Sequence, residues 1–302
     1  MYPTLVVITG PTAVGKTKLC VEVAQHFSCD IISADSRQFF KELSIGTAKP
    51  TSDEMQNVIH HFVNSHSIIS AYNVNDFEQD VLKLLPQLFK QNPLVILTGG
   101  SGLYIDSICD GFDDDLPQGD EKIRKQLEDL YNKYGIEILQ EKLKQLDPSF
   151  YKEIDLSNLK RLYRAIEVCL LSGKTYSELR LGVKQKRQFN IIKIALKRDK
   201  EDLFNRINLR VDIMMQQGLL DEVKQVEKYR DTNALKTVGY RELFDFLDKK
   251  ISLEEATEKI KVNTRRYAKK QIAWFNRNND YKWFHPNDKE LIISYIESHL
   301  NS

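Results

Sequence analysis

A glycine-rich stretch near the N-terminus carries the clearest chemistry in the sequence. Residues 10–17 read Gly-Pro-Thr-Ala-Val-Gly-Lys-Thr and match the phosphate-binding pattern G-x-x-x-x-G-K-[ST]. An apolar run, 5–9, precedes this loop, and a helical pattern follows it. In such a context backbone N–H groups and the helix N-terminus converge on one anion. Lys16 adds a positive charge and Thr17 a hydroxyl suited to Mg²⁺. The pattern predicts a phosphate site, without saying whose phosphate it holds.

Polar residues also follow two further apolar runs. Asp35 comes directly after residues 30–34, and a Gly-Gly-Ser-Gly stretch containing Ser101 comes after residues 94–98. If these runs are parallel strands, their carboxyl ends lie at the edge where α/β sheets bind ligands. Asp35 has three open interpretations: a Mg²⁺ ligand through water, a general base, or a turn or helix-capping residue. The strand over 94–98 does not end in an aspartate, which argues against a motor or switch NTPase.

Two other polar features are better explained by structure than by chemistry. Lys49 lies in the polar loop 45–50, where it could assist a diphosphate, although a solvated loop lysine is the favoured interpretation. His60 and His61 stand together without a Cys or carboxylate at metal-ligand spacing, which favours a structural role.

The order of the patterns predicts an α/β fold, with a P-loop NTPase-like parallel sheet core flanked by helices and an all-helical insertion domain. The acidic, turn-rich stretch 113–120 indicates a linker. Helical patterns without strand signal follow until residues 190–196 resume the sheet. We therefore expect a core of residues 1–112 and 190–302 and an insertion of residues 113–189. The helices are expected at 76–91, 121–146, 155–180 and 200–229.

The most basic stretch is 264–275, in which Arg266, Lys269 and Lys270 alternate with aromatic residues. Clustered cations among aromatics on a helix are the footprint expected for a nucleic-acid backbone. A packed amphipathic helix with its cations outward is the competing interpretation, and both can hold. Arg161 and Arg164 are three residues apart on one helical face, where a plain solvated face is the alternative.

The bulk composition limits the remaining classes. With 44 Lys and Arg against 43 Asp and Glu the net charge is only +1, so any basic surface must be local. The four cysteines are scattered, which favours reduced thiols and a cytoplasmic location. No apolar run approaches the length of a membrane span, and a strand beginning within five residues of Met1 leaves no room for a signal peptide. Nothing in the sequence argues for a dimer, so a monomer is expected.

Several motifs, in order and at matching spacing, resemble one family. They are Gly10 to Thr17, Ser33-Ala-Asp35-Ser36-Arg37-Gln38, Ile45-Gly-Thr-Ala-Lys-Pro50, Gly99-Gly-Ser-Gly-Leu-Tyr104, Arg161-Leu-Tyr-Arg164-Ala-Ile-Glu-Val168, Ser172-Gly-Lys-Thr175, Gly239-Tyr-Arg241 and Arg266-Tyr-Ala-Lys-Lys-Gln271-Ile-Ala-Trp274. Together they are similar to the tRNA dimethylallyltransferases, the bacterial tRNA isopentenyltransferases, over about residues 5 to 284. Ser101 stands where that family more often has threonine, and it keeps the hydroxyl.

The resemblance implies a reaction and a set of residues. The activity implied is transfer of a dimethylallyl group from dimethylallyl diphosphate to N6 of adenosine 37 in the anticodon stem-loop of tRNA, with release of diphosphate and with Mg²⁺ as cofactor. It implies catalytic roles for Asp35 as general base and for Ser101 and Arg210. The diphosphate would bind Gly10, Pro11, Thr12, Ala13, Val14, Gly15, Lys16 and Thr17, with Thr17 on the metal. The tRNA would contact Asp35, Ser36, Arg37, Gln38, Ser101, Arg124, Lys160, Arg161, Leu162, Tyr163 and Arg164, together with the cations of the basic stretch.

Two other classes compete with this interpretation. A small-molecule kinase would use ATP on the same loop, but the basic C-terminal helix and the missing strand-end aspartate favour the transferase. A non-catalytic RNA-binding ATPase would make no modified nucleoside.

Overall fold

The computed structural model describes residues 2–111, 116–117, 119–180 and 185–300. The chain divides into two compact units, one of residues 1–109 and 187–302 and the other of residues 110–186. The second unit begins and ends three residues earlier than the insertion expected at 113–189. Of the acidic stretch expected as a linker, residues 113–115 and 118 lie outside the described residues.

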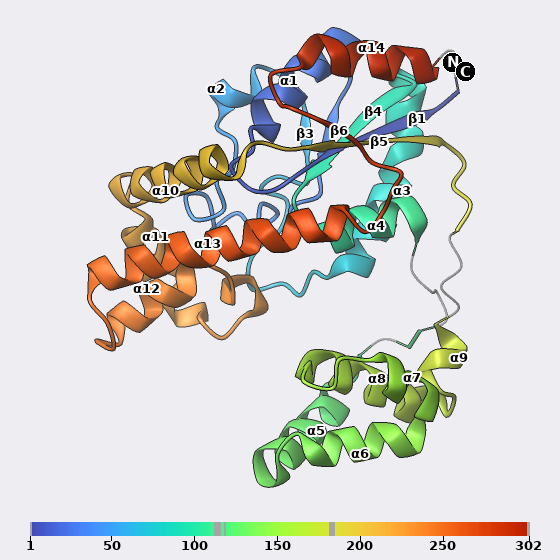
Figure 1. Cartoon of the computed structure of the whole chain (residues 1–302), viewed down its shortest axis with the longest axis vertical. Coiled ribbons are helices and arrows are strands. Elements are labelled where there is room, and N and C mark those ends of the chain that lie inside the picture. The colour runs from blue at the N-terminus through green and yellow to red at the C-terminus, as the bar shows by residue number, and fades with distance from the viewer. Residues whose placement is uncertain (1, 112–115, 118, 181–184, 301–302) are drawn as a thin grey trace. The chain divides into compact units, whose positions relative to one another are not determined.

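The first unit is built on a six-stranded sheet with the order β3-β2-β4-β1-β5-β6 (Figure 1). Its strands are β1 Thr4–Thr9, β2 Ile31–Ser33, β3 His60–His61, β4 Leu94–Gly99, β5 Asn190–Leu196 and β6 Lys282–Phe284, and every neighbouring pair is parallel. β1, β4 and β5 are rich in β-branched and other apolar residues because both faces of a parallel sheet are buried. This confirms the parallel α/β fold predicted from the sequence.

Helices cover both faces of this sheet (Figure 1). The buried side chains of α1 (Lys16–Phe27) and α14 (Lys289–Leu300) join one face in a single apolar cluster. Those of α3 (Val74–Gln91) and α4 (Gly102–Asp110) join the other face in a second cluster. The sheet is thus the middle layer of three, and its carboxyl edge is left to the loops that follow β1, β2 and β4.

A helical subassembly beside that edge holds a third apolar cluster. It contains α10 (Lys200–Gln216), α11 (Leu219–Val226), α12 (Tyr240–Leu247) and α13 (Leu253–Phe275), together with the short η1 (Glu227–Tyr229) and η2 (Asn233–Leu235). The short α2 (Ser52–Met55) lies elsewhere in the same unit. The single helix expected over 200–229 is divided, because Gly218 takes a left-handed φ of 96° between α10 and α11. The basic stretch lies within the last three turns of α13.

The second unit has its own apolar core. Its helices are α5 (Glu121–Tyr134), α6 (Glu137–Leu146), α7 (Pro148–Glu153), α8 (Leu159–Ser172) and α9 (Tyr176–Leu179). The helix expected over 121–146 is divided at Gly135, whose φ is 81°. The helix expected within 155–180, with its end near Gly173, is α8, which ends at Ser172 and is capped by Gly173 at a φ of 68°. Across the ranges that the structure describes, we find no helix long and apolar enough to cross a membrane.

Candidate active site

The loop between β1 and α1 has the backbone expected of a phosphate cradle. Gly15 caps α1 with a left-handed φ of 111°, and Ala13 also adopts a left-handed φ of 63°, which is uncommon for a residue with a Cβ atom. The Lys16 ammonium donates hydrogen bonds to the carbonyls of Gly10 (3.0 Å) and Pro11 (2.9 Å). The lysine therefore folds over the loop and lies where an anion in the cradle would meet it.

The charge of Lys16 is finely set by its surroundings. Burial lowers the pKa of Lys16 to about 8, with Asp35 acting in the opposite direction and Arg210 adding to the decrease. Asp35 is therefore close enough to Lys16 for the two charges to interact, although they belong to loops after different strands. An anion bound in the loop would supply the negative charge that the buried ammonium lacks.

Three arginines contact oxygen atoms of this loop. The guanidinium of Arg206 donates to the Ala13 carbonyl (2.9 Å) and that of Arg198 to the Val14 carbonyl (2.7 Å). Arg210 lies by the Thr12 hydroxyl at 3.4 Å. Because arginines donate hydrogen bonds to these loop oxygens, the strained turn at Ala13 is stabilised. Arg210 was predicted from the sequence, whereas Arg198 and Arg206 were missed; the four-residue spacing of Arg206 and Arg210 was the available signal.

The loops after β2 and β4 are joined by hydrogen bonds at the same edge. Ser101 Oγ accepts from the Ser36 N–H (3.0 Å) and donates to Ser36 Oγ (3.1 Å). The Asp35 carboxylate accepts from the Arg37 N–H (3.0 Å). Asp35 therefore stabilises the turn in which it lies, which is one of the three interpretations that the sequence left open. One of its carboxylate oxygens accepts this hydrogen bond.

Gln271 of α13 bridges two of these loops, and sequence reasoning did not single it out. Its Oε1 accepts from the Thr12 N–H (2.8 Å) and its Nε2 donates to the Gly100 carbonyl (2.9 Å). The amide packs so closely on Gly100 that a Cβ atom at that position would collide with Gln271 Nε2. A side chain at position 100 would therefore displace the Gln271 amide from this bridge.

Tyr267, one turn before Gln271 on α13, completes the group. As a residue it is 42% exposed, but its hydroxyl end is buried. Burial, with the charge of Asp35, raises the pKa of Tyr267 to about 12, while hydrogen bonds with Ser101 and Gln271 act in the opposite direction. Tyr267, Ser101 and Gln271 therefore form one network beside Asp35.

Lys49 and His61, outside the phosphate loop, make contacts that hold the fold together. The Lys49 ammonium donates to the Phe40 carbonyl (2.7 Å) and to Asn64 Oδ1 (2.6 Å), and burial lowers the pKa of Lys49 to about 8. The solvated-loop interpretation of Lys49 is therefore wrong, since the side chain ties its loop together. His61 pairs with Asp30 at 2.8 Å.

Glu222 of α11 links two of the family-like motifs. Its carboxylate accepts N–H hydrogen bonds from Ser44 (2.7 Å), Ile45 (2.8 Å) and Gly46 (2.9 Å). It also accepts from the Tyr240 hydroxyl at 2.6 Å. The loop at 44–46 and the start of α12 are thus fixed to one half-buried carboxylate, which explains both motifs structurally.

In the second unit, two arginines predicted to contact RNA bind a protein carboxylate. Glu167 is 1% exposed; its side chain accepts from Arg124 Nε (2.8 Å) and Arg164 Nη1 (2.8 Å). Although burial acts to raise it, the pKa of Glu167 is lowered, because these arginines and the Asp120 N–H donate hydrogen bonds to the carboxylate. Arg124 and Arg164 therefore stabilise the helical unit, whatever else they bind.

The neighbouring expected contacts differ in exposure. Lys160 and Arg161 are exposed on α8, whereas Leu162 is fully buried in the unit's core and Tyr163 is half-buried. The Leu162 side chain cannot contact RNA in this fold, because it packs among the apolar residues beneath α8. We leave Leu162 out of the RNA surface proposed below.

The residues that the structure describes contain no group of three or more His, Cys, Asp or Glu able to hold a metal ion. The oxygen donor that the phosphate loop itself offers is the Thr17 hydroxyl, a kind of ligand that Mg²⁺ takes together with ligand phosphates and water.

The fold and the site define a P-loop α/β protein in which a phosphate cradle, a hydroxyl and a carboxylate follow three adjacent parallel strands. A profile described as IPP transferase matches residues 38–278. A protein named tRNA dimethylallyltransferase 1 from Bacteroides thetaiotaomicron is 47% identical over 97% of this chain and 95% of its own. The chain belongs to the IPP transferase family.

Solved structures give the same result. The tRNA isopentenylpyrophosphate transferase of Bacillus halodurans has 34% identity and a TM-score of 0.74, covering 99% of this chain and 97% of its own. A eukaryotic dimethylallyltransferase described as acting on tRNA has 26% identity and a TM-score of 0.79, covering 94% of this chain and 74% of its own. These relatives favour the transferase over the kinase interpretation of the loop.

Proposed function

We infer that this enzyme is a tRNA dimethylallyltransferase, which transfers a dimethylallyl group to N6 of adenosine 37 in the anticodon loop. One observation carries the inference: the order β2-β4-β1 places Asp35, Ser101 and the phosphate cradle on three consecutive strand ends. Neighbouring strands are about 4.8 Å apart, so the cradle and Asp35 stand about 10 Å apart. A five-carbon group fits between a diphosphate at one end of this row and an amine at the other.

In the reaction proposed, the adenine N6 atom attacks the first carbon of the prenyl group. The carbon–oxygen bond to the diphosphate breaks, and its electron pair leaves with the diphosphate. Lys16 and the N–H groups of residues 10–17 stabilise this developing negative charge. Asp35 accepts the N6 proton. Ser101 holds Ser36, and with it the loop that carries Asp35, through its hydrogen bonds.

We propose that Arg210 supports the cradle through Thr12 and that Thr17 contributes a ligand to Mg²⁺. When bound, the metal would neutralise charge on the leaving diphosphate. The tRNA contacts proposed in the first unit are the loop 35–38 and the exposed cations Arg266, Lys269 and Lys270, and those proposed in the second unit are the exposed Lys160 and Arg161. An anticodon-loop nucleotide suits this site because unstacking it costs only a few kcal/mol.

A mass-spectrometric assay tests the function directly. The enzyme is incubated with dimethylallyl diphosphate and a tRNA transcript that has adenosine at position 37, and the digested nucleosides are analysed. Isopentenyladenosine is expected from this transcript and not from a matched transcript with guanosine at that position. If only ATP-dependent products form, or if the nucleosides are unchanged, the proposed function is wrong.

A further inference from the structure

An aromatic ring surrounded by cations lies on α10 and α13, apart from the phosphate cradle. Phe204 is half-buried, and three cations stand over or beside its ring. The distances to the ring centroid are 5.8 Å from the Lys200 ammonium, 5.9 Å from the Arg265 guanidinium and 5.6 Å from the Lys269 ammonium. Lys200 belongs to α10, whereas Arg265 and Lys269 belong to α13. The ring therefore gathers cations from two helices at one spot.

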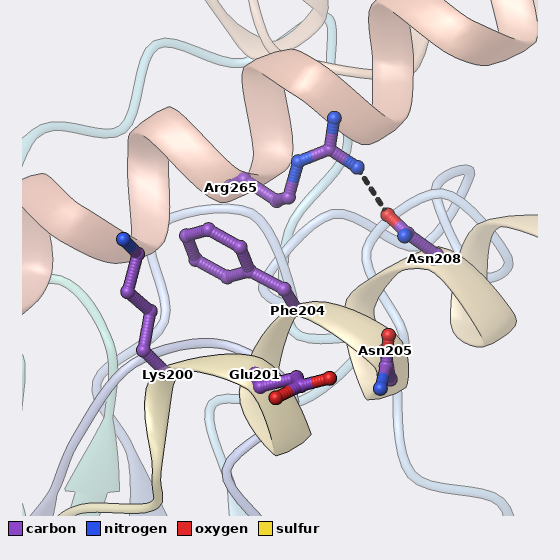
Figure 2. Close-up of a pocket in the computed structure, with 6 residues that line it drawn as sticks. All are labelled: Lys200, Glu201, Phe204, Asn205, Asn208 and Arg265. Atoms are coloured by element: carbon purple, nitrogen blue, oxygen red, sulfur yellow. Dashed lines mark hydrogen bonds between the residues drawn. The ribbon is translucent and has the colours of Figure 1, made fainter.

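These residues border a hollow in the surface. The hollow has a volume of about 530 Å³ and is lined by Lys200, Glu201, Phe204, Asn205, Asn208 and Arg265 (Figure 2). Asn208 accepts a hydrogen bond from Arg265, which fixes the guanidinium beside the ring. Lys200 and Arg265 line the hollow with one carboxylate, that of Glu201, and Lys269 lies beside the same ring, so the local charge is +2. We call these six residues with Lys269 the cation hollow.

Three cations around one ring are the arrangement expected of a site that binds an anion. Three like charges around one ring repel one another, and contacts with the ring face offset this only in part. A phosphate would relieve the repulsion, since it can accept the fork of a guanidinium and the point charges of two ammonium groups together. Phe204 pre-organises the flexible side chains, which lowers the entropy lost on binding.

The cation hollow is distinct from the diphosphate site. At 100° per residue, Phe204 is about 200° around α10 from Arg206, which binds the phosphate loop. On α13, Arg265 and Gln271, which also binds that loop, are about 120° apart. The two sites therefore use different faces of α10 and of α13. The exposed cations Arg266 and Lys270 continue around α13 from the hollow toward the reaction site.

We propose that the cation hollow binds a backbone phosphate of the tRNA substrate, away from the nucleotide that is modified. The proposal rests on the proposed function, since it takes tRNA as the substrate. A polynucleotide is favoured over a free anion because Lys200 and Asn205 are exposed and the basic face of α13 is continuous. One long polyanion can follow that face from the hollow to the reaction site.

The test compares three lysine and phenylalanine variants with a matched control. Lys200→Gln removes one cation, Phe204→Leu removes the ring but keeps an apolar side chain, and Lys200→Arg restores the charge. Lys83→Gln removes an exposed lysine on α3 as the control. For each variant, tRNA affinity is measured against salt concentration, together with the KM for dimethylallyl diphosphate and the melting temperature.

We expect Lys200→Gln to weaken tRNA binding about threefold to fivefold. It should also lower the slope of log affinity against log salt by about 0.9, as the loss of one phosphate contact does. Phe204→Leu should weaken tRNA binding in the same direction, Lys200→Arg should restore it, and the KM for dimethylallyl diphosphate should not change. The proposal is overturned if Lys200→Gln matches Lys83→Gln, or if the KM for the diphosphate rises while tRNA affinity is unchanged. If the wild-type enzyme does not modify tRNA, the proposed function itself is wrong.

Discussion

At the scale of single residues, Lys16 should make diphosphate binding depend on pH. Its pKa is about 8 in the free protein because it is buried, and a bound anion raises that pKa. Below pH 8 the ammonium is already charged, so Lys16 should add no pH dependence to the affinity. Above pH 8 binding must take up a proton, so Lys16 should contribute about a tenfold rise per pH unit in the Kd for inorganic diphosphate.

Calorimetric titration from pH 6.5 to 9.5 measures this, in about half-unit steps. Lys16→Arg is the control, because arginine keeps its charge over the range and leaves only the protonation of the diphosphate itself. Equal slopes for the two proteins would show that Lys16 does not titrate on binding.

The Asp35 side chain gives a second prediction at this scale. Asp35→Asn keeps the size and the acceptor for the Arg37 N–H but cannot take a proton, so kcat should fall by about 10² to 10⁴. The Kd for tRNA should change little. Single-turnover assays with saturating tRNA measure the rate. If the variant turned over at the wild-type rate, Asp35 would not be the general base.

At the scale of elements, α13 connects the phosphate loop to the end of β4 through Gln271. Gln271→Ala leaves the Thr12 N–H and the Gly100 carbonyl without this partner, which should cost about 2 kcal/mol of unfolding free energy. The KM for dimethylallyl diphosphate should rise about tenfold, because the loop is no longer held. Urea unfolding and steady-state kinetics check both, with the exposed Gln91→Ala as the control. An unchanged KM would mean that the loop holds its shape without α13.

On α8, two arginines three residues apart should behave differently. Arg164→Ala removes a partner of buried Glu167 and should destabilise the helical unit by about 2 kcal/mol. Arg161→Ala, at an exposed position, should change stability by less than about 0.5 kcal/mol yet weaken tRNA binding. Chemical unfolding followed by circular dichroism and a tRNA binding assay separate the two effects. Equal stability of both variants would contradict this division.

The elements differ in how far the sequence predicts them. The phosphate loop and the strands β1, β4 and β5 have long local patterns, and the structure has them where they were expected. β3 and β6 have two and three residues, too few for a periodic signal. The pairing of Thr12 with Gln271 spans 259 residues and has no local signature. The spacing of three residues between Arg164 and Glu167 is enough to indicate an ion pair on one helix. It carries no signal that Glu167 is buried.

At the scale of the whole molecule, the net charge of +1 conceals local basic surfaces. If Lys160, Arg161, Arg266, Lys269 and Lys270 each neutralise one phosphate, they give log affinity for tRNA against log salt a slope of about −4 to −5, and Lys200 in the cation hollow adds about −0.9. Binding titrations between 50 and 200 mM salt, about the range over which such contacts are lost, measure it. A flat response would contradict an RNA surface built on these cations.

The arginines and the glutamine that complete the phosphate cradle have a consequence for synthesis. Arg206 is 193 residues from its partner Ala13, and Gln271 is 259 from Thr12. A ribosome releases the cradle first and its supports last, so the glycine loop stays unsupported through most of translation. Contacts of such long sequence separation also form late in refolding. A nascent or truncated chain that ends before α13 therefore displays the loop motif but cannot assemble the complete cradle.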